Sequence, residues 1–123
     1  MDIKVLVTNG STQERKNITQ SLREIGVRNI VEVTNGDEAV SGVRTDNIDI
    51  VFADFNTQVG GQGIVDAIRK IDGNLPIIVT APQSQKISNV KKTAPNASNY
   101  LTTPFTTQQL QQAIADFVPS VVG

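Results

Sequence analysis

The 123-residue sequence contains no cysteine and no histidine. Without cysteine the chain has no disulfide, thiolate metal ligand or thiol nucleophile, and without histidine it lacks the commonest general base and transition-metal ligand. These absences exclude most hydrolase and zinc chemistries. We therefore expect a protein that is not an enzyme.

The sequence also lacks an excess of charge and any long apolar run. Eleven basic and twelve acidic side chains give a net charge of −1, so there is no basic field that would hold nucleic acid. No apolar run approaches the roughly 20 residues that span a bilayer, and the first residues do not resemble a signal peptide. We expect a cytoplasmic protein that binds neither nucleic acid nor a membrane, and a single domain over residues 1–123.

Five short apolar runs rich in β-branched residues alternate along the chain with amphipathic segments. Each run has the length of a buried strand, and the segments between the runs repeat apolar residues at helical spacing. The runs cover residues 3–7, 30–33, 48–53, 76–80 and 99–102. Strand followed by helix five times predicts an α/β fold, in which helices cover both faces of a parallel sheet.

The expected strand order follows from which runs are continuously apolar. Glu32 lies in the second run and the fifth run is half polar, which favours the sheet edges, whereas residues 50–52 and 77–79 suit the centre. Right-handed crossovers then give a doubly wound five-stranded parallel sheet of order 2-1-3-4-5. In such sheets the ligand crevice lies at the carboxyl ends of the strands, beside the point where the order reverses. The residues expected there are Thr8, Asn9 and Asp54.

The first helix has recognisable signals at both ends. Ser11 and Glu14 have the spacing of a capping box, in which the hydroxyl and the carboxylate accept hydrogen bonds from free amides at the helix start. Gly26 is predicted to end the helix. We therefore expect Glu14 to act as a helix cap.

Four short motifs near the ends of the predicted strands give the sequence a family resemblance. They are Val51-Phe52-Ala53-Asp54, Ile78-Val79-Thr80-Ala81, Asn99-Tyr100-Leu101 and Pro104-Phe105. With these motifs at these separations, the chain resembles the receiver domain of two-component response regulators over residues 3–118. The resemblance implies a flavodoxin-like (CheY-like) (βα)5 fold and a role as a stand-alone receiver in phosphorelay signal transduction.

The resemblance also implies roles for single residues. Asp54 falls at the position of the phosphoryl-accepting aspartate. Thr80 and Tyr100 fall at the positions of the hydroxyl and aromatic residues that switch together in the family. The Thr103-Pro104 bond falls where the family commonly has a cis peptide, which proline permits at about 1 kcal/mol.

Other positions depart from the family's pattern, because an acidic pair and a lysine are replaced by neutral residues. Mg²⁺ is usually held by one or two carboxylates, and phosphoryl transfer relies on neutralising charge on the phosphoryl oxygens. We therefore predict weak or absent Mg²⁺ binding, no cofactor, and slow or absent phosphorylation. The acidic pair is replaced by Thr8 and Asn9 and the lysine by Thr103, and the degenerate pocket is expected to comprise Thr8, Asn9, Asn56, Ala81 and Thr103.

The sequence thus favours a module that acts through protein–protein contacts with weak or no phosphorylation. In receivers the face made by the fourth helix, fifth strand and fifth helix commonly carries partner contacts, and a sensor histidine kinase or a downstream target is the expected partner. An alternative role for Lys86 on this face is to supply positive charge to the degenerate pocket. The face includes Lys86, Lys91, Lys92, Gln108, Gln109, Gln111 and Gln112.

An alternative function is that of a flavodoxin-like module that binds FMN or a phosphoester. Residues 7–14 resemble the phosphate loop of flavodoxins, where hydroxyls and amides at a helix start hold the phosphate. Flavin rings are generally stacked between aromatic side chains, however, and only 4% of this sequence is aromatic, with no tryptophan. A colourless purified protein without flavin absorbance would remove this alternative.

Overall fold

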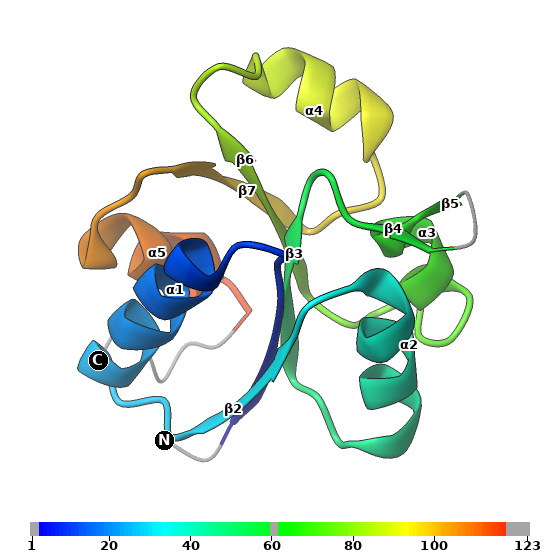
Figure 1. The fold of residues 1–123 in the computed structure, drawn as a ribbon, viewed down its shortest axis with the longest axis horizontal. Helices are drawn as coiled ribbons and strands as arrows, with labels where there is room; N and C mark the ends of the chain where they lie inside the picture. The colour runs from blue at the N-terminus through cyan, green and yellow to red at the C-terminus, as the bar shows by residue number, and fades with distance from the viewer. Residues whose placement is uncertain (1–2, 60–61, 118–123) are drawn as a thin grey trace.

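A parallel five-stranded sheet forms the centre of the computed structural model, which describes residues 3–59 and 62–117. The strands lie in the order β2-β1-β3-β6-β7 (Figure 1). Numbered by their position along the chain, these strands have the order 2-1-3-4-5, which confirms the predicted doubly wound sheet. They are β1 (Lys4–Thr8), β2 (Asn29–Val33), β3 (Ile50–Asp54), β6 (Ile77–Pro82) and β7 (Asn99–Thr103).

Helices cover both faces of this sheet (Figure 1). On one face, α1 (Thr12–Glu24) and α5 (Thr107–Ile114) lie side by side. The other face is covered by α2 (Gly36–Thr45), α3 (Ile64–Arg69) and α4 (Ile87–Thr93). No helix in the described part of the chain is long and apolar enough to cross a membrane.

A short antiparallel pair of strands, which the sequence did not predict, precedes α3. It consists of β4 (Gln58–Val59) and β5 (Gln62–Gly63). The pair stands apart from the main sheet, so it does not alter the order of the parallel strands.

Alternation of side chains along the strands divides the core into two clusters. Val7, Phe52 and Ile78 belong to the cluster beneath α1 and α5, and Phe52 is only 1% exposed there. Leu6 and Val79, each one residue away from a member of the first cluster, belong to the cluster beneath α2, α3 and α4. Because the period of a strand is two residues, this division fixes which face each polar residue at a strand end occupies.

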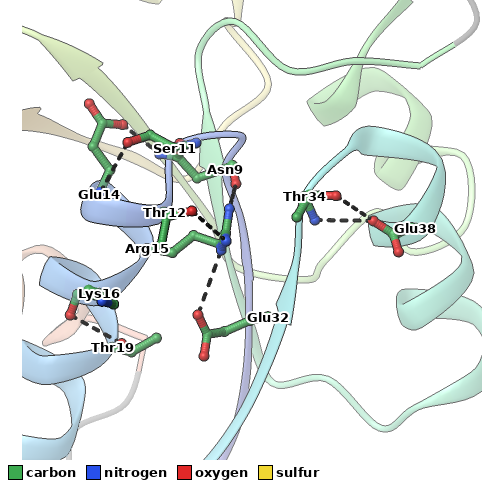
Figure 2. A network of polar contacts seen from close by, with 10 residues as sticks. All are labelled: Asn9, Ser11, Thr12, Glu14, Arg15, Lys16, Thr19, Glu32, Thr34 and Glu38. Atoms are coloured by element: carbon green, nitrogen blue, oxygen red, sulfur yellow. Dashed lines mark hydrogen bonds and ion pairs between the residues drawn. The ribbon is translucent and has the colours of Figure 1, made fainter.

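The helix ends follow the local signals in most respects. Ser11 is the N-cap of α1, and Gly26 just after the helix has a positive φ of 100°, which suits glycine. At the start of α2, Asn35 accepts a hydrogen bond from the Glu38 amide, while the Glu38 carboxylate accepts one from the Thr34 hydroxyl (Figure 2). These caps set the loops that follow β1 and β2.

Candidate functional site

The carboxyl ends of β1, β3 and β6 bring three polar residues together. Thr8 pairs with Ala53 across β1 and β3, so Asn9, the next residue, lies beside Asp54 at the strand ends. Asp54 in turn pairs with Thr80 across β3 and β6. Asp54 and Thr80 each lie two residues beyond a member of the cluster beneath α1 and α5, so their side chains share that face.

The Asp54 carboxyl is half-buried, and its surroundings favour the neutral form. Burial raises the pKa of Asp54 above its ordinary value, and the negative charge of Glu14 raises it further. Hydrogen bonds from the Asn56 and Phe55 amides lower the pKa of Asp54 and offset part of this effect. A carboxylate at this site therefore lacks a compensating positive charge from the surrounding described residues.

Glu14 belongs to this site, although the sequence indicated only a capping role. Its carboxylate Oε2 accepts a hydrogen bond of 2.6 Å from the Asn9 side-chain amide (Figure 2). The Ser11 amide donates to Asn9 Oδ1 at 2.8 Å, and the Ser11 hydroxyl accepts from the Glu14 amide at 3.3 Å. The predicted capping box is thus half wrong, because Asn9 takes the place of the Glu14 carboxylate at the Ser11 amide. The sequence signal that could have placed Glu14 at the site is its position in the first turn of the helix that follows β1.

The same bonds bear on the flavodoxin-like alternative. A phosphate at the start of α1 would need free amides there. The amides of Ser11 and Glu14 are already hydrogen-bonded within the loop. This loop therefore does not offer those two donors to a phosphate.

Thr80 has a buried hydroxyl with no partner in the described structure. Its side chain is 1% exposed, and its Oγ1 makes no hydrogen bond to a described residue. An unsatisfied buried hydroxyl carries a free-energy cost of about 1 to 3 kcal/mol. Since it lies next to Asp54, Thr80 is a donor or acceptor available to a group that enters the pocket.

Tyr100 lies on the opposite face of the sheet from Thr80. It packs against the cluster beneath α2, α3 and α4, and its hydroxyl donates a hydrogen bond to the Ala94 carbonyl just after α4. Lys91 Nζ lies 5.7 Å from the centroid of the Tyr100 ring. In this structure Tyr100 therefore ties β7 to α4, and the sheet separates it from the Thr80 hydroxyl.

The remaining residues of the predicted pocket occupy different surroundings. Thr8 is buried and donates from its hydroxyl to the Asn35 carbonyl at 3.3 Å, on the α2 side. Ala81 is buried in the cluster beneath α2, α3 and α4, whereas Asn56 is exposed in the loop after β3. Thr103 is partly exposed at the end of β7 and precedes a cis bond to Pro104, as predicted.

The carboxylates gathered here are few for a Mg²⁺ site. Among the residues at 3–59 and 62–117, no three acidic side chains come together in a way that could hold a metal ion. Glu14 acts electrostatically on Asp54 at the strand ends, and the Asn9 amide is engaged with Glu14. Mg²⁺ requires nearly octahedral oxygen ligands. These donors do not match an acidic pair at the end of β1.

Replacing Asp54 by asparagine is expected to stabilise the protein at neutral pH. The pKa of Asp54 is raised in the folded state. The contribution of this group to the free energy of unfolding is therefore fully present below the unfolded pKa of about 3.9, and it is lost as the pH rises through the folded pKa. Asp54→Asn removes this loss. We expect a gain on the order of 1 kcal/mol at pH 7, limited by solvent screening, and little difference at pH 4.

Urea unfolding at the two pH values measures this difference. The matched control is Asp116→Asn, which removes an exposed carboxylate beyond the end of α5 and should leave the profile unchanged. If the Asp54→Asn variant is no more stable than the wild type at pH 7, the claim that the Asp54 carboxylate lacks a compensating positive charge is wrong.

Comparison with known proteins identifies the class to which this fold and site belong. The family model described as response regulator receiver domain matches residues 5–115. The chain therefore belongs to the receiver domain family of two-component signalling, whose members interact with histidine kinases and other proteins.

Relatives with known names agree with this assignment. The chain is 23% identical to the chemotaxis protein CheY of Pseudomonas aeruginosa, over 98% of this chain and 100% of the relative. It is 25% identical to a CheY homologue of Campylobacter jejuni, over 98% of this chain and 96% of the relative. The match thus extends over nearly the whole of both CheY proteins.

Solved structures show the same fold. Vibrio cholerae CheY4 superposes with a TM-score of 0.78 at 21% identity, over 94% of this chain and 98% of that chain. The receiver domain of a sensor histidine kinase from Pseudomonas aeruginosa has a TM-score of 0.81 at 20% identity, over 97% and 99% of the two chains. The structure of that domain holds a magnesium ion in its active-site cleft. At these identities, the likeness establishes the CheY-like fold.

Proposed function

We propose that this receiver domain signals through protein–protein contacts and does not depend on Mg²⁺-assisted phosphorylation of Asp54. The observation that carries the proposal is the arrangement around Asp54, where the like-charged Glu14 acts on the carboxyl and raises its pKa. Phosphoryl transfer proceeds by positioning and by neutralising the charge of the phosphoryl oxygens. A second carboxylate at this place opposes that neutralisation.

The size of the expected loss supports the proposal. Removing a single donor that stabilises developing charge typically costs about 10²- to 10³-fold in rate, or about 3 to 4 kcal/mol. Thr8 and Asn9 stand where the family has an acidic pair that would hold the metal, and Thr103 stands where it has a lysine, so the losses of metal and of ammonium combine. We infer a domain without enzymatic activity and without a bound cofactor.

Lys86 makes no contact with Asp54 in the described part of the chain. It is exposed at the N-cap of α4, and the ion pair found in the described chain joins Arg15 to Glu32. No described contact therefore supports the alternative in which Lys86 takes the role of the family's lysine beside Asp54.

The surface proposed for partner binding is the face of α4, β7 and α5. Lys86, Lys91 and Lys92 are exposed on and beside α4, and Ile87 is an exposed large apolar side chain at 40%. The bond from Tyr100 to Ala94 couples the position of α4 to β7. A sensor histidine kinase or a downstream target that binds this face would sense the position of α4. The face also carries Gln108, Gln109, Gln111 and Gln112 on α5.

Amide NMR spectra recorded with and without Mg²⁺ and beryllofluoride test this proposal. Beryllofluoride mimics a phosphoryl group on an aspartate, so a competent receiver shows large shifts, and such a receiver serves as the positive control. We expect the spectrum of this protein to remain nearly unchanged. Saturable shifts centred on Asp54 and Thr80 would overturn the proposal.

A further inference from the structure

The Asn9-Gly10 dipeptide after β1 holds both reacting groups of an intramolecular acyl transfer. The electrophile is the side-chain carbonyl carbon of Asn9, and the nucleophile is the backbone nitrogen of Gly10. Asn9 is buried but Gly10 is exposed, so water reaches the dipeptide from the Gly10 side. Among the described residues the Gly10 amide has no acceptor, and glycine has no side chain to hinder the approach. Attack of this nitrogen on that carbon closes a five-membered imide.

The Asn9 side chain is held over the Gly10 peptide by the loop itself. Its Oδ1 accepts a hydrogen bond of 2.8 Å from the Ser11 amide, two residues further along, which is the pattern of an Asx turn. Negative charge develops on this oxygen when a nucleophile adds to the carbonyl carbon, and a donor fixed on the oxygen stabilises that charge. The Ser11 amide is therefore an oxyanion donor for the Asn9 side chain.

Two charged side chains contact the other atoms that react (Figure 2). The Arg15 guanidinium donates to the Asn9 backbone carbonyl at 2.7 Å, which draws electrons from the peptide and makes the Gly10 N–H more acidic. The Glu14 carboxylate accepts from Asn9 Nδ2 at 2.6 Å, so a group that carries protons lies beside the leaving nitrogen. Nucleophile, electrophile and leaving group thus each have a polar partner.

A second asparagine–glycine pair, Asn35-Gly36, lacks this arrangement. Gly36 is buried as the first residue of α2, and Asn35 Oδ1 accepts from the Glu38 amide, three residues further along. The Asn35 carbonyl accepts from the neutral Thr8 hydroxyl at 3.3 Å, and no cation of the described chain donates to it. This pair is therefore an internal control with the same dipeptide sequence in different surroundings.

We propose that Asn9 deamidates spontaneously in the folded protein, assisted by these three contacts, and becomes an acidic residue. The Gly10 nitrogen bonds to Asn9 Cγ, the bond from Cγ to Nδ2 breaks, and Glu14 relays the Gly10 amide proton to Nδ2, which leaves as ammonia. Water then opens the imide, to aspartate by cleavage at Cγ or to isoaspartate by cleavage at the backbone carbonyl. One water is consumed and one ammonia is released, without any oxidant or reductant.

The modification adds a negative charge where β1 and β3 end. The new carboxylate replaces the hydrogen bond from Asn9 to Glu14 by repulsion, and it lies at the strand end beside Asp54. The protein thus has two charge states at the position where the family carries an acidic residue. This inference goes beyond the proposed function, because it concerns a change in the chain itself and does not depend on phosphorylation of Asp54.

Peptide mapping after incubation of the folded protein at mildly alkaline pH tests this inference. The incubation uses water labelled with heavy oxygen, which enters the new carboxyl group and distinguishes the product from deamidation during digestion. We expect labelled aspartate and isoaspartate at position 9, and change at Asn35 at least about tenfold slower, because it lacks the donors. An Asn9 that keeps its amide, or an Asn35 that changes as fast, would overturn the inference.

The unfolded chain provides a control for the effect of sequence alone. In concentrated urea the contacts of Asn9 are lost, so Asn9 and Asn35 should deamidate at similar rates. If the preference for Asn9 is the same in urea as in the folded protein, the neighbouring sequence sets the reactivity and the inference is wrong.

Three variants test the role of each contact. A Cβ built at Gly10 lies 3.9 Å from the Thr34 carbonyl oxygen, so Gly10→Ala fits the loop and only hinders the attack. Glu14→Gln keeps an acceptor for the leaving nitrogen but relays no proton, and Arg15→Ala removes the cation from the peptide. Each variant should slow deamidation at least about tenfold, whereas Arg44→Ala on α2 should leave the rate unchanged. Wild-type rates in Glu14→Gln and Arg15→Ala would overturn the inference.

Discussion

Restoring the family's charged groups should raise the rate of Asp54 phosphorylation by about four orders of magnitude. The variant combines Thr8→Asp, Asn9→Asp and Thr103→Lys, which rebuilds the acidic pair and the ammonium. Each restored charge contribution is worth about 10²- to 10³-fold, and two act here, one through the metal and one through the lysine. Intact-mass measurement after incubation with Mg²⁺ and acetyl phosphate, a small-molecule phosphodonor, follows the reaction.

The structure adds Glu14 to this experiment. In the wild type the Asn9 amide donates to Glu14 at 2.6 Å, so Asn9→Asp replaces that hydrogen bond by repulsion between carboxylates. Adding Glu14→Gln restores a donor beside the new carboxylate, and we expect this fourfold variant to react faster than the threefold one. If both variants stay as inert as the wild type, the geometry of the loops limits the site and the missing charges do not.

Loss of Arg69 should destabilise the fold by about 2 to 3 kcal/mol. Its guanidinium donates to the Leu75 carbonyl at 2.6 Å, the Asn96 carbonyl at 3.0 Å and the Ser98 hydroxyl at 3.2 Å. These bonds join the end of α3 to the loop that precedes β6 and to the loop between α4 and β7. Arg69→Ala leaves carbonyls of a tight connection without their donor, and urea unfolding measures the cost.

Two further variants control for charge and for side-chain length. Arg44→Ala removes an exposed arginine in the last turn of α2 and should change stability by less than about 0.5 kcal/mol. Arg69→Lys keeps the charge but not the planar donor geometry, so it should recover little of the loss. An Arg69→Ala variant as stable as Arg44→Ala would show that the network contributes nothing measurable.

The sheet was predictable because its signals are periodic and physical. Continuous apolar runs at residues 50–52 and 77–79 indicated central strands, and the charge at Glu32 indicated an edge. The strand order then placed Asn9 and Asp54 at neighbouring strand ends, as the register of β1 and β3 confirms. The cis bond before Pro104 followed from the family resemblance and is present.

The features of the site that the sequence did not predict depend on contacts between side chains, which local sequence patterns do not specify. The spacing of Ser11 and Glu14 is that of a capping box, but the Asn9 side chain accepts from the Ser11 amide and donates to the Glu14 carboxylate. Thr80 and Tyr100 were expected to act together, yet strand register decides that they project from opposite faces. Their joint switching role stays a prediction.

The most direct measurement of the central claim is the intact mass of the wild-type protein after incubation with Mg²⁺ and acetyl phosphate. If a like-charged neighbour and neutral substitutions have removed the support for phosphoryl transfer, the mass stays that of the unmodified chain. A phosphoryl adduct that forms readily on the wild type and is absent from Asp54→Asn would contradict the claim.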